Sequence, residues 1–570
     1  MKRIFIIAAV ALLSPYFTTR GQETAIRREV TLYNPYKPSL PDVVKKSFLP
    51  DMTDTARITP VISYSINTNP YTPPYTVSPL RPATMVPDPL NKLYNSYIRA
   101  GFGNYLSPLG EVSITNQRSR KGMAGFYAGH YSSGGKVRLD NGDKGLAGYM
   151  DNNASLYGKK FLNESLLYGS ADFSQNVRYA YGYDTSFTDY NPSGKDIRLN
   201  YISAGATAGI ASYVRDSSDI SYKAEAGYNF FSSGSSRYEN NLHVSGEASG
   251  MIKGFYAGAG LEYRYFKPAS DISPSGIWVL SLSPYLKKKT EDWDVRLGAS
   301  FLLDRELNET AKLKLYPDFR FSFNILPSYL RFYAELTGKL QTNRPEEIIR
   351  INPFLDPDTI LYMIKSTSTP IALAAGFTGE TGLDGFYRVY ASYTVSDNMV
   401  LFSNFVSFDS LLVYSGRGNY FIPVYDDAEI LSLNGETGGK INNHLKFNLN
   451  ASWFRYTLSN NASAWGLPDW KAGLKLEYNL RNKIIADLRI NATGSRQALQ
   501  TYRNLEDLLT TTRVISLPAN LTLGLGAEYR YTKILSFWVK FNNISFSKYY
   551  EWAWYPSQRF NFMAGFTYSL

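Results

Sequence analysis

The last eleven residues of the chain alternate between apolar and polar side chains, and this pattern limits the fold more than any other stretch. The apolar face carries Phe560, Phe562, Ala564, Phe566, Tyr568 and Leu570. The polar face carries Asn561, Gly565, Thr567 and Ser569, with Met563 as the apolar exception. Because successive strand side chains point to opposite faces, this segment predicts a strand with one apolar side. The sealing strand of a membrane barrel needs such a face, since an open edge in lipid leaves backbone groups unsatisfied. A soluble all-β domain that ends in its core strand is the alternative for this segment alone.

The composition of the chain favours the barrel. Aromatic residues make up 15% of the 570 residues, with 46 tyrosines and 8 tryptophans. Such rings form girdles where a barrel crosses the two membrane interfaces. Charged residues make up 19%, below the roughly 25% of ordinary soluble domains.

The start of the chain predicts an exported protein. Met1, Lys2 and Arg3 precede an apolar run over residues 4–13, which has the length of a secretory signal core and is too short to span a bilayer. We therefore expect residues 1–22 to be a signal peptide. The absence of cysteine excludes disulfides, thiolate metal sites and cysteine nucleophiles. Export and strands without disulfides together predict a multi-pass β-barrel in a bacterial outer membrane.

The net charge of +11 has two interpretations. The basic residues could contact lipopolysaccharide phosphates or anionic solutes, or they could be scattered over loops and lumen. The partners expected of such a barrel are outer-membrane lipid and lipopolysaccharide. Nucleic acid is not an expected partner of an exported protein.

Proline separates residues 23–92 from the rest of the chain. This segment holds 12 of the 28 prolines, a density that prevents a continuous sheet ladder or a helix. We expect a proline-rich segment that lies in the periplasm or fills the lumen. In the periplasm it could contact a periplasmic or outer-membrane protein.

From residue 93 to residue 570 the pattern predicts strands of about 10–16 residues with alternating faces. The alternation is clearest over residues 255–265, 470–480 and 519–531. Its polar positions are our candidates for the lumen lining: Glu262, Arg264, Lys471, Lys475, Glu477, Glu528 and Arg530. Short turns alternate with long links at 134–146, 182–195, 342–368 and 496–515, which predicts about 22 strands with the long links outside. Residues 384–424 leave open whether residues 399–402 continue one strand or begin another.

Four segments in the last half resemble one known family. Residues 542–551 read Asn-Asn-Ile-Ser-Phe-Ser-Lys-Tyr-Tyr-Glu, and residues 555–560 read Tyr-Pro-Ser-Gln-Arg-Phe. Residues 352–357 read Asn-Pro-Phe-Leu-Asp-Pro, and a strand-like segment follows at 392–400. Together these segments resemble the barrels of TonB-dependent receptors. The resemblance implies a 22-stranded outer-membrane barrel that imports or binds a solute.

The N-terminal part departs from that family. Its members carry a folded plug domain before the barrel, whereas here only residues 23–92 lie between the expected signal peptide and the first strand. Glu29, Val30, Thr31 and Leu32 resemble a TonB box and are the candidate periplasmic contact. We therefore expect a receptor-type barrel without the usual plug.

The sequence predicts no catalytic residue, no metal site and no cofactor. The three histidines, His130, His243 and His444, lack a nucleophile elbow or a metal-binding spacing, and the alternation places His243 and His444 on the lumen side. The longest link, 342–368, is the best candidate for an external binding or lid element, because long ordered loops often carry function. Its charged residues are Arg344, Glu346, Glu347, Arg350 and Asp356. Trp552 and Trp554 could form an external docking loop, although an aromatic girdle is the favoured interpretation.

These observations predict an all-β fold: one transmembrane antiparallel β-barrel of about 22 strands with a short proline-rich N-terminal segment. Two functions follow. The first is solute transport or binding across the outer membrane through a barrel of the TonB-dependent-receptor type. The second is a non-transporting scaffold or accessory barrel of an outer-membrane assembly or secretion complex. Neither function is enzymatic, and the sequence identifies neither the solute nor the partner.

Overall fold

The computed structural model describes residues 61, 63–65, 94–116, 119–185, 193–213, 220–234, 237–268, 276–306, 309–356, 363–382, 384–408, 420–504 and 510–570. All described helices and strands belong to one unit of the chain, residues 89–570. The expected signal peptide 1–22 and the candidate contact Glu29–Leu32 lie outside the described residues. So does the proline-rich segment 23–92, apart from residues 61 and 63–65.

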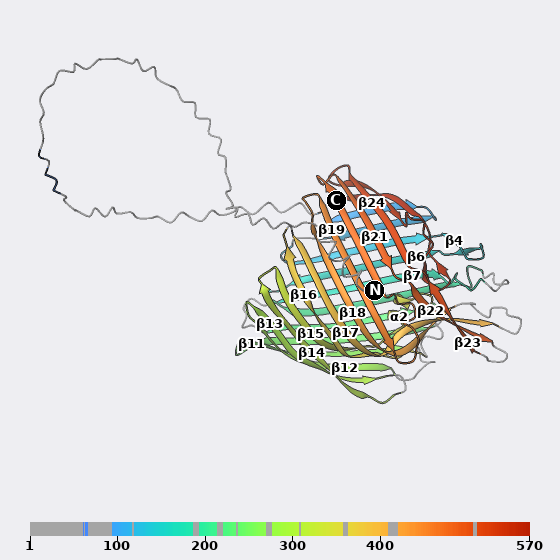
Figure 1. The fold of residues 1–570 in the computed structure, drawn as a ribbon, viewed down its shortest axis with the longest axis horizontal. Helices are drawn as coiled ribbons and strands as arrows, with labels where there is room; N and C mark the ends of the chain where they lie inside the picture. The colour runs from blue at the N-terminus through green and yellow to red at the C-terminus, as the bar shows by residue number, and fades with distance from the viewer. Residues whose placement is uncertain are drawn as a thin grey trace, which may run out of the picture. The chain divides into compact units, whose positions relative to one another are not determined.

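Within the described residues, 22 antiparallel strands close into one barrel, as the sequence predicted. Each strand pairs with the next one in the ring (Figure 1). The pairing of β1 with β28 closes the ring. The strands in ring order are β1 (Ser96–Gly103), β2 (Ser107–Thr115), β3 (Gly122–Ser133), β6 (Tyr149–Phe161), β7 (Ser165–Tyr179), β8 (Arg198–Ser212), β9 (Ser221–Ser232), β10 (Tyr238–Ile252), β11 (Phe255–Pro268), β12 (Ile277–Lys289), β13 (Trp293–Arg305), β14 (Lys312–Leu326), β15 (Leu330–Gln341), β16 (Thr367–Thr381), β17 (Gly385–Phe408), β18 (Tyr420–Lys440), β19 (Leu445–Leu458), β20 (Trp470–Leu480), β21 (Ile484–Thr493), β24 (Asn520–Arg530), β25 (Leu535–Asn542) and β28 (Asn561–Ser569).

The closing strand β28 lies between β25 and β1. Phe566 is opposite Ala100 on one side and Phe537 on the other. Backbone hydrogen bonds between Ser96 and Leu570 in both directions extend the pairing to the final residue. Strand β28 is therefore paired along both edges. Its backbone N–H and C=O groups thus find partners within the barrel, as the membrane requires.

The two faces of the wall differ as the alternation predicted. On β1, Ile98 and Phe102 are about half exposed on the outer face, whereas Arg99 points inward toward Glu111 of β2. On β10, Leu242 and Val244 point outward, and His243 lies on the inner face. This arrangement is expected of a membrane barrel, because its outer face contacts lipid and its inner face contacts water.

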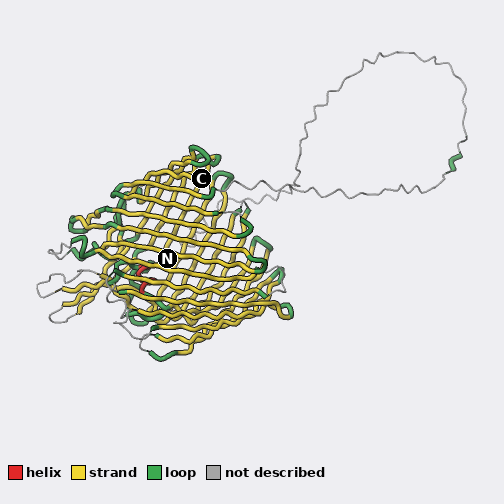
Figure 2. Tube along the Cα trace, turned by 180° about the vertical axis from the view of Figure 1, so that it is seen from behind, coloured by secondary structure: helices red, strands yellow, loops and turns green. Residues whose placement is uncertain are grey.

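Most of the short turns lie at the end of the barrel that holds Ser96 and Leu570, although the three-residue turn 104–106 between β1 and β2 lies at the other end. The longer links lie at the opposite end, here called the outer mouth, where the small hairpins also lie (Figures 1 and 2). These smaller elements are β4 (Lys136–Arg138) with β5 (Lys144–Leu146), β22 (Arg496–Asn504) with β23 (Thr510–Leu517), β26 (Tyr550–Trp552) with β27 (Tyr555–Pro556), and helix α2 (Pro345–Ile351).

The ambiguity at residues 384–424 resolves into one long strand, β17. The register between β17 and β18 shifts between Ser396 and Met399, and Asn398 has a positive φ of 53°. This irregularity is a β-bulge, which bends a strand and increases its twist. The bulge lets residues 399–408 continue beyond the barrel wall in the same strand.

Candidate functional site

An apolar cluster at the outer mouth, here called the mouth core, is the largest group of buried apolar side chains in the described part of the chain. It joins residues of the barrel wall to residues from several links. Its members are Ala180, Ile197, Leu199, Tyr201, Phe231, Ile348, Ile349, Phe354, Leu355, Phe402, Phe421, Ala498, Leu517, Ala553 and Tyr555. Strands β8 and β17 lie nearly half-way round the ring from each other, yet both contribute to this cluster. The mouth core therefore spans the lumen.

Aromatic rings form the centre of the mouth core. The rings of Phe354 and Tyr555 stack with their centroids 3.9 Å apart, and Tyr181 meets both rings edge-on. The hydroxyl of Tyr181 donates a hydrogen bond of 2.8 Å to the carbonyl of Pro556, and burial raises the pKa of Tyr181. Paired aromatic rings bury a large apolar area in a fixed geometry. The cluster is thus packed like a domain interior.

A small sheet, here called the lid sheet, lies over the mouth core. It consists of residues 354–356, 399–408 of β17, 420–428 of β18, and the hairpin β22–β23. Strand β22 runs parallel to β17, with Ser403 opposite Leu499, and the hydroxyls of Ser403 and Thr501 lie 3.0 Å apart. On the other side, Leu355 forms a bridge to Phe421. The lid sheet is therefore held by backbone ladders as well as by side-chain packing.

Helix α2 brings charged residues from the β15–β16 link to the inner wall. Pro345 occupies its first turn, where a missing backbone N–H costs nothing. The carboxylate of Glu347 accepts a hydrogen bond of 3.3 Å from the backbone N–H of Arg344, which caps the helix. The apolar side chains of Ile348 and Ile349 enter the mouth core. Glu346, on another face of the helix, points to the wall.

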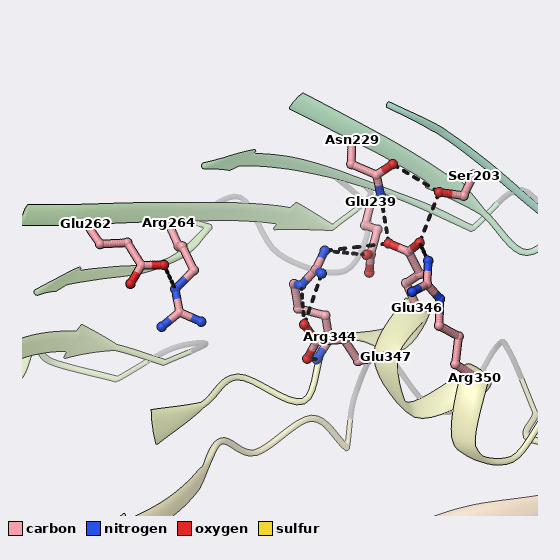
Figure 3. A network of polar contacts seen from close by, with 9 residues as sticks. All are labelled: Ser203, Asn229, Glu239, Glu262, Arg264, Arg344, Glu346, Glu347 and Arg350. Carbon is pink, nitrogen blue, oxygen red and sulfur yellow. Dashed lines mark hydrogen bonds and ion pairs between the residues drawn. The ribbon is translucent and has the colours of Figure 1, made fainter. Parts of the chain in front are cut away.

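Glu346 anchors α2 to strands β8 and β9 (Figure 3). The hydroxyl of Ser203 donates to its Oε1 at 3.0 Å, and the amide of Asn229 donates to Oε2 at 2.7 Å. Arg350, one turn along the helix, donates to Oε1 at 2.9 Å. Only 5% of Glu346 is exposed. A buried carboxylate needs such donors, because an unpaired buried charge is very costly.

A second carboxylate lies beside this anchor. Glu239 of β10 is 1% exposed, and its Oε1 is 3.6 Å from Nη1 of Arg344. The same Nη1 lies 3.7 Å from Oε2 of Glu346. One guanidinium therefore holds two buried carboxylates from the wall and the helix (Figure 3). The guanidinium of Arg344 therefore compensates part of the charge of Glu239.

A polar cavity of about 450 Å³ lies against the inner wall beneath α2. Its wall side is lined by hydroxyl, amide and carboxylate groups of β6–β10, including Asn153, Asp172 and Thr207. Arg350 and Glu346 line it from the helix side. A second cavity of about 170 Å³ shares Ser203, Glu346 and Arg350 and extends toward Tyr201 and Phe231. Helix α2 thus separates the polar lumen from the mouth core.

The structure distributes the lumen candidates over the inner wall without gathering them into one site. Glu262 pairs with Arg264 at 3.1 Å (Figure 3) and also with His243 at 3.1 Å. Lys475 and Glu477 are 3.7 Å apart on β20, and Glu528 and Arg530 are 3.5 Å apart on β24. Lys471 lies at the outer end of β20, opposite Thr493. His444 lies in the turn before β19, not on the lumen wall as the alternation suggested.

The external-loop candidates lie at the mouth but point inward. Arg344, Glu346, Glu347 and Arg350 belong to α2 or its cap, and Asp356 donates its backbone N–H to the carbonyl of Phe421 at 3.1 Å. Trp552 packs edge-on against Phe402 and Phe421, and Trp554 is half-buried against the mouth core. The favoured girdle interpretation is therefore wrong for Trp552, because its ring packs against strand residues of the lid sheet instead of lipid.

Three residues of this site escaped the sequence interpretation: Ser203, Asn229 and Glu239. The alternation of β8, β9 and β10 does place polar side chains on the lumen face at these positions. Their contact with α2 bridges 143 residues for Ser203 and 117 for Asn229. No local pattern predicts a contact at that separation.

Among the described residues there is no group of three or more His, Cys, Asp or Glu side chains that could hold a metal ion. No described helix combines the length and the apolar character needed to cross a membrane.

No protein-family model and no curated protein matches the sequence. Solved structures do match. The siderophore receptor PirA from Acinetobacter baumannii aligns with a TM-score of 0.60 at 10% identity, over 85% of this chain and 81% of that chain. The copper transporter OprC aligns with a TM-score of 0.59 at 12% identity, over 84% and 80%. The pyoverdine outer membrane receptor FpvA from Pseudomonas aeruginosa PAO1, bound to pyoverdine, aligns with a TM-score of 0.58 at 12% identity, over 85% and 79%.

The described barrel has the same fold as these receptor and transporter barrels. This confirms the fold that the resemblance of residues 352–357, 542–551 and 555–560 implied. The chain is accordingly a multi-pass β-barrel of the outer membrane, with an architecture that it shares with transport receptors. Identities of 10–12% carry the fold and no more.

Proposed function

We propose that this protein is a gated transport barrel, in which the lid sheet and α2 close the outer mouth and open to admit a polar solute. One observation carries the proposal: Glu346 fixes α2 to the inner wall by side-chain contacts alone, at the boundary between the mouth core and a polar cavity. Side-chain contacts of this kind can be exchanged without breaking the barrel ladder, whereas wall strands cannot separate in lipid.

The polar cavity supports binding of the solute. Ligand sites commonly enclose about 300–1,000 Å³ and carry a few converging polar groups. The cavity of about 450 Å³ lies within that range, and Asp172, Asn153 and Arg350 offer acceptors and donors on opposite sides. A solute that competes for Arg350 or Asn229 would weaken the hold on Glu346. Binding and opening would then be coupled, as population shift requires.

A disulfide across the lid sheet tests the gate, because the native chain has no cysteine. The hydroxyls of Ser403 and Thr501 are 3.0 Å apart, so Ser403→Cys with Thr501→Cys should form a bridge that fixes β22 to β17. We expect few openings in planar bilayers when the bridge is oxidised, and openings at the wild-type frequency after reduction.

A second bridge serves as the control. Ser283 of β12 and Ser300 of β13 also have hydroxyls 2.8 Å apart, but they lie within the barrel wall. Ser283→Cys with Ser300→Cys should leave the conductance unchanged in both redox states. Equal conductance of the oxidised and reduced lid variant would overturn the proposed gate.

The scaffold function stays a second candidate because of the mouth core. Closure by a packed aromatic cluster, with Phe354 stacked on Tyr555, also suits a barrel that holds partners and passes nothing. Residues 23–92 would then be the periplasmic contact. Co-purification of other envelope proteins with a barrel that shows no conductance, lost on deletion of 23–92, would support the scaffold. A large, steady open conductance would contradict it.

A further inference from the structure

Two basic side chains converge on one indole ring at the inner wall, beside the seam between β1 and β28, and a third lies on a neighbouring strand. The guanidinium carbon of Arg99 on β1 lies 4.5 Å from the ring centroid of Trp538 on β25. The Nζ of Lys540, two residues further along β25, lies 5.7 Å from the same ring. Arg489 of β21 reaches the cluster from the other side of β24, where it is opposite Gly524. We call this group the seam cluster.

The wall is shaped to seat this indole. A Cβ atom at Gly101 would lie 2.5 Å from Cη2 of Trp538, and a Cβ at Gly565 would lie 2.5 Å from Cζ2. Side chains are thus missing at neighbouring positions on both strands of the seam, where Gly101 pairs with Gly565. Trp538 fills the space and is 5% exposed. Its indole N–H has no hydrogen-bond partner in the described structure.

The charges of the seam cluster do not balance. Arg99 pairs with Glu111 at 3.7 Å, and Arg489 pairs with Asp487 at 2.9 Å. Lys540 is half-buried and forms no ion pair with any described residue. Two cations therefore share one ring while only one of them has a carboxylate partner. Like charges repel more strongly where burial reduces screening, so the cluster favours a negative ligand.

We propose that the seam cluster is an anion-binding site, which takes a carboxylate or phosphate group of the solute in the lumen. Lys540 supplies the unpaired charge, and Arg99 and Arg489 flank it with planar donors suited to oxyanions. The Nη2 of Arg489 also lacks a hydrogen bond in the described structure. Cation–π contacts with the indole of Trp538 position Arg99 and Lys540 on the inner wall.

Lipid headgroups do not reach this site. Phe537 and Phe541, the alternate residues of β25, lie on the outer face, and Phe537 is half exposed there. Lys540 and Trp538 therefore face the lumen. The inference rests on the proposed function only in that the anion is taken to be part of a transported solute; anion binding itself can be measured without transport.

Titration of the folded, full-length barrel in detergent micelles tests the site. Pyrophosphate is the probe in one arm and citrate in the other, which separates phosphate from carboxylate recognition. We expect saturable heat of binding for the wild type that weakens as ionic strength rises. Lys540→Met should weaken binding about tenfold, as expected for one lost charge-assisted contact. Lys540→Arg keeps the charge and should restore binding.

Lys287→Met is the matched control, because Lys287 of β12 is another inner-wall lysine but pairs with Asp294 at 3.5 Å and lies far from the seam in the ring. It should bind both anions as the wild type does. Wild-type barrel that binds neither anion saturably would overturn the site, as would equal binding by wild type and Lys540→Met. Each variant is shown to be folded if its migration in gel electrophoresis still changes after the sample is heated. A barrel that binds anions but never conducts would contradict only the proposed transport.

Discussion

Asn404 of β17 and Gln500 of β22 face each other across two parallel strands of the lid sheet, and both are completely buried. None of their four side-chain amide atoms has a hydrogen-bond partner in the described structure. A buried polar group without a partner costs about 1–3 kcal/mol. The closed lid therefore contains a pair of groups that would gain hydrogen bonds with water if β22 left β17. This is the behaviour expected of a closure that has to open.

Replacing this pair by apolar side chains should hold the lid closed. In Asn404→Leu with Gln500→Met the unpaired amides are gone and the volume is kept, so the closed state should gain about 1–3 kcal/mol. Opening events in planar bilayers should become about tenfold rarer. Asn450→Leu, which removes an exposed amide from the inner wall of β19, is the control. More frequent openings in the double variant would show that the amide pair stabilises the closed lid.

Removal of the Glu346 carboxylate should have the opposite effect. Glu346→Ala deletes the acceptor for Ser203, Asn229 and Arg350, and hydrogen bonds to charged groups contribute about 1.5–3 kcal/mol. We expect the closed state to lose about 2 kcal/mol, which makes openings about 30-fold more frequent.

The matched variant for this prediction is Glu335→Ala, which removes a carboxylate from the inner wall of β15 away from α2. It should open as the wild type does. Unchanged opening in Glu346→Ala would mean that the mouth core holds α2 without help from this anchor. The same measurement would then favour the scaffold over the gate.

Outer links 134–148 and 543–560 are joined by Asp140, which contacts both Lys548 and Tyr550. Burial raises the pKa of Asp140, but hydrogen bonds from Lys548 and Tyr550 outweigh it and lower the pKa below the ordinary value. A lowered pKa in the folded state means that the contact stabilises fully above the ordinary value of about 3.9 and is lost as the pH falls through the lowered value. Between pH 5 and pH 8 we expect no change.

Hydrogen exchange of the two links measures this contact. Asp140→Asn at pH 7 should lower the protection against exchange in both links, and the wild type should approach the same protection only at pH values below the ordinary pKa of an aspartate. Asp143→Asn changes a neighbouring carboxylate that accepts hydrogen bonds from Asn141 in its own link and from Tyr183 in the link between β7 and β8, so it should leave link 543–560 unchanged. Wild-type protection that is lost already at pH 5 would contradict the lowered pKa.

The parts of the fold that could be predicted from sequence are those with a local signal. The alternation of Phe566 and Tyr568 with Thr567 identifies β28, because burial on one face acts on every second residue of a strand. The strand count followed from the same signal and from the turns. Asn398 carried a further local hint, since asparagine tolerates the positive φ of a bulge.

The gate could not be predicted in the same way, because its contacts join residues far apart in the sequence. The charges of Glu346 and Arg350 marked a long link, and link length suggested an outward lid. The inward position of α2 depends on Ser203, 143 residues away. Seven residues in α2 are also too few for a helical period to be visible. For Lys540, the alternation of side chains along β25 predicts the lumen face. Its closeness to Arg99, however, depends on the pairing of β28 with β1, which closes the barrel.

Adding even a methyl group at Gly101, in the seam between β1 and β28, should lower the stability of the barrel. In Gly101→Ala the new Cβ would lie 2.5 Å from Trp538 and 3.0 Å from the carbonyl of Ala564, so either the indole or β28 must move. Overpacking of this kind costs about 1–3 kcal/mol, and we expect unfolding at a lower urea concentration. Gly110→Ala on β2 meets nothing within 4 Å and should leave stability unchanged. Because Trp538→Leu removes the ring from the slot, it should recover part of the stability that Gly101→Ala loses. If the two substitutions are simply additive, the indole is not what excludes a side chain at residue 101, and the contact with β28 accounts for the loss.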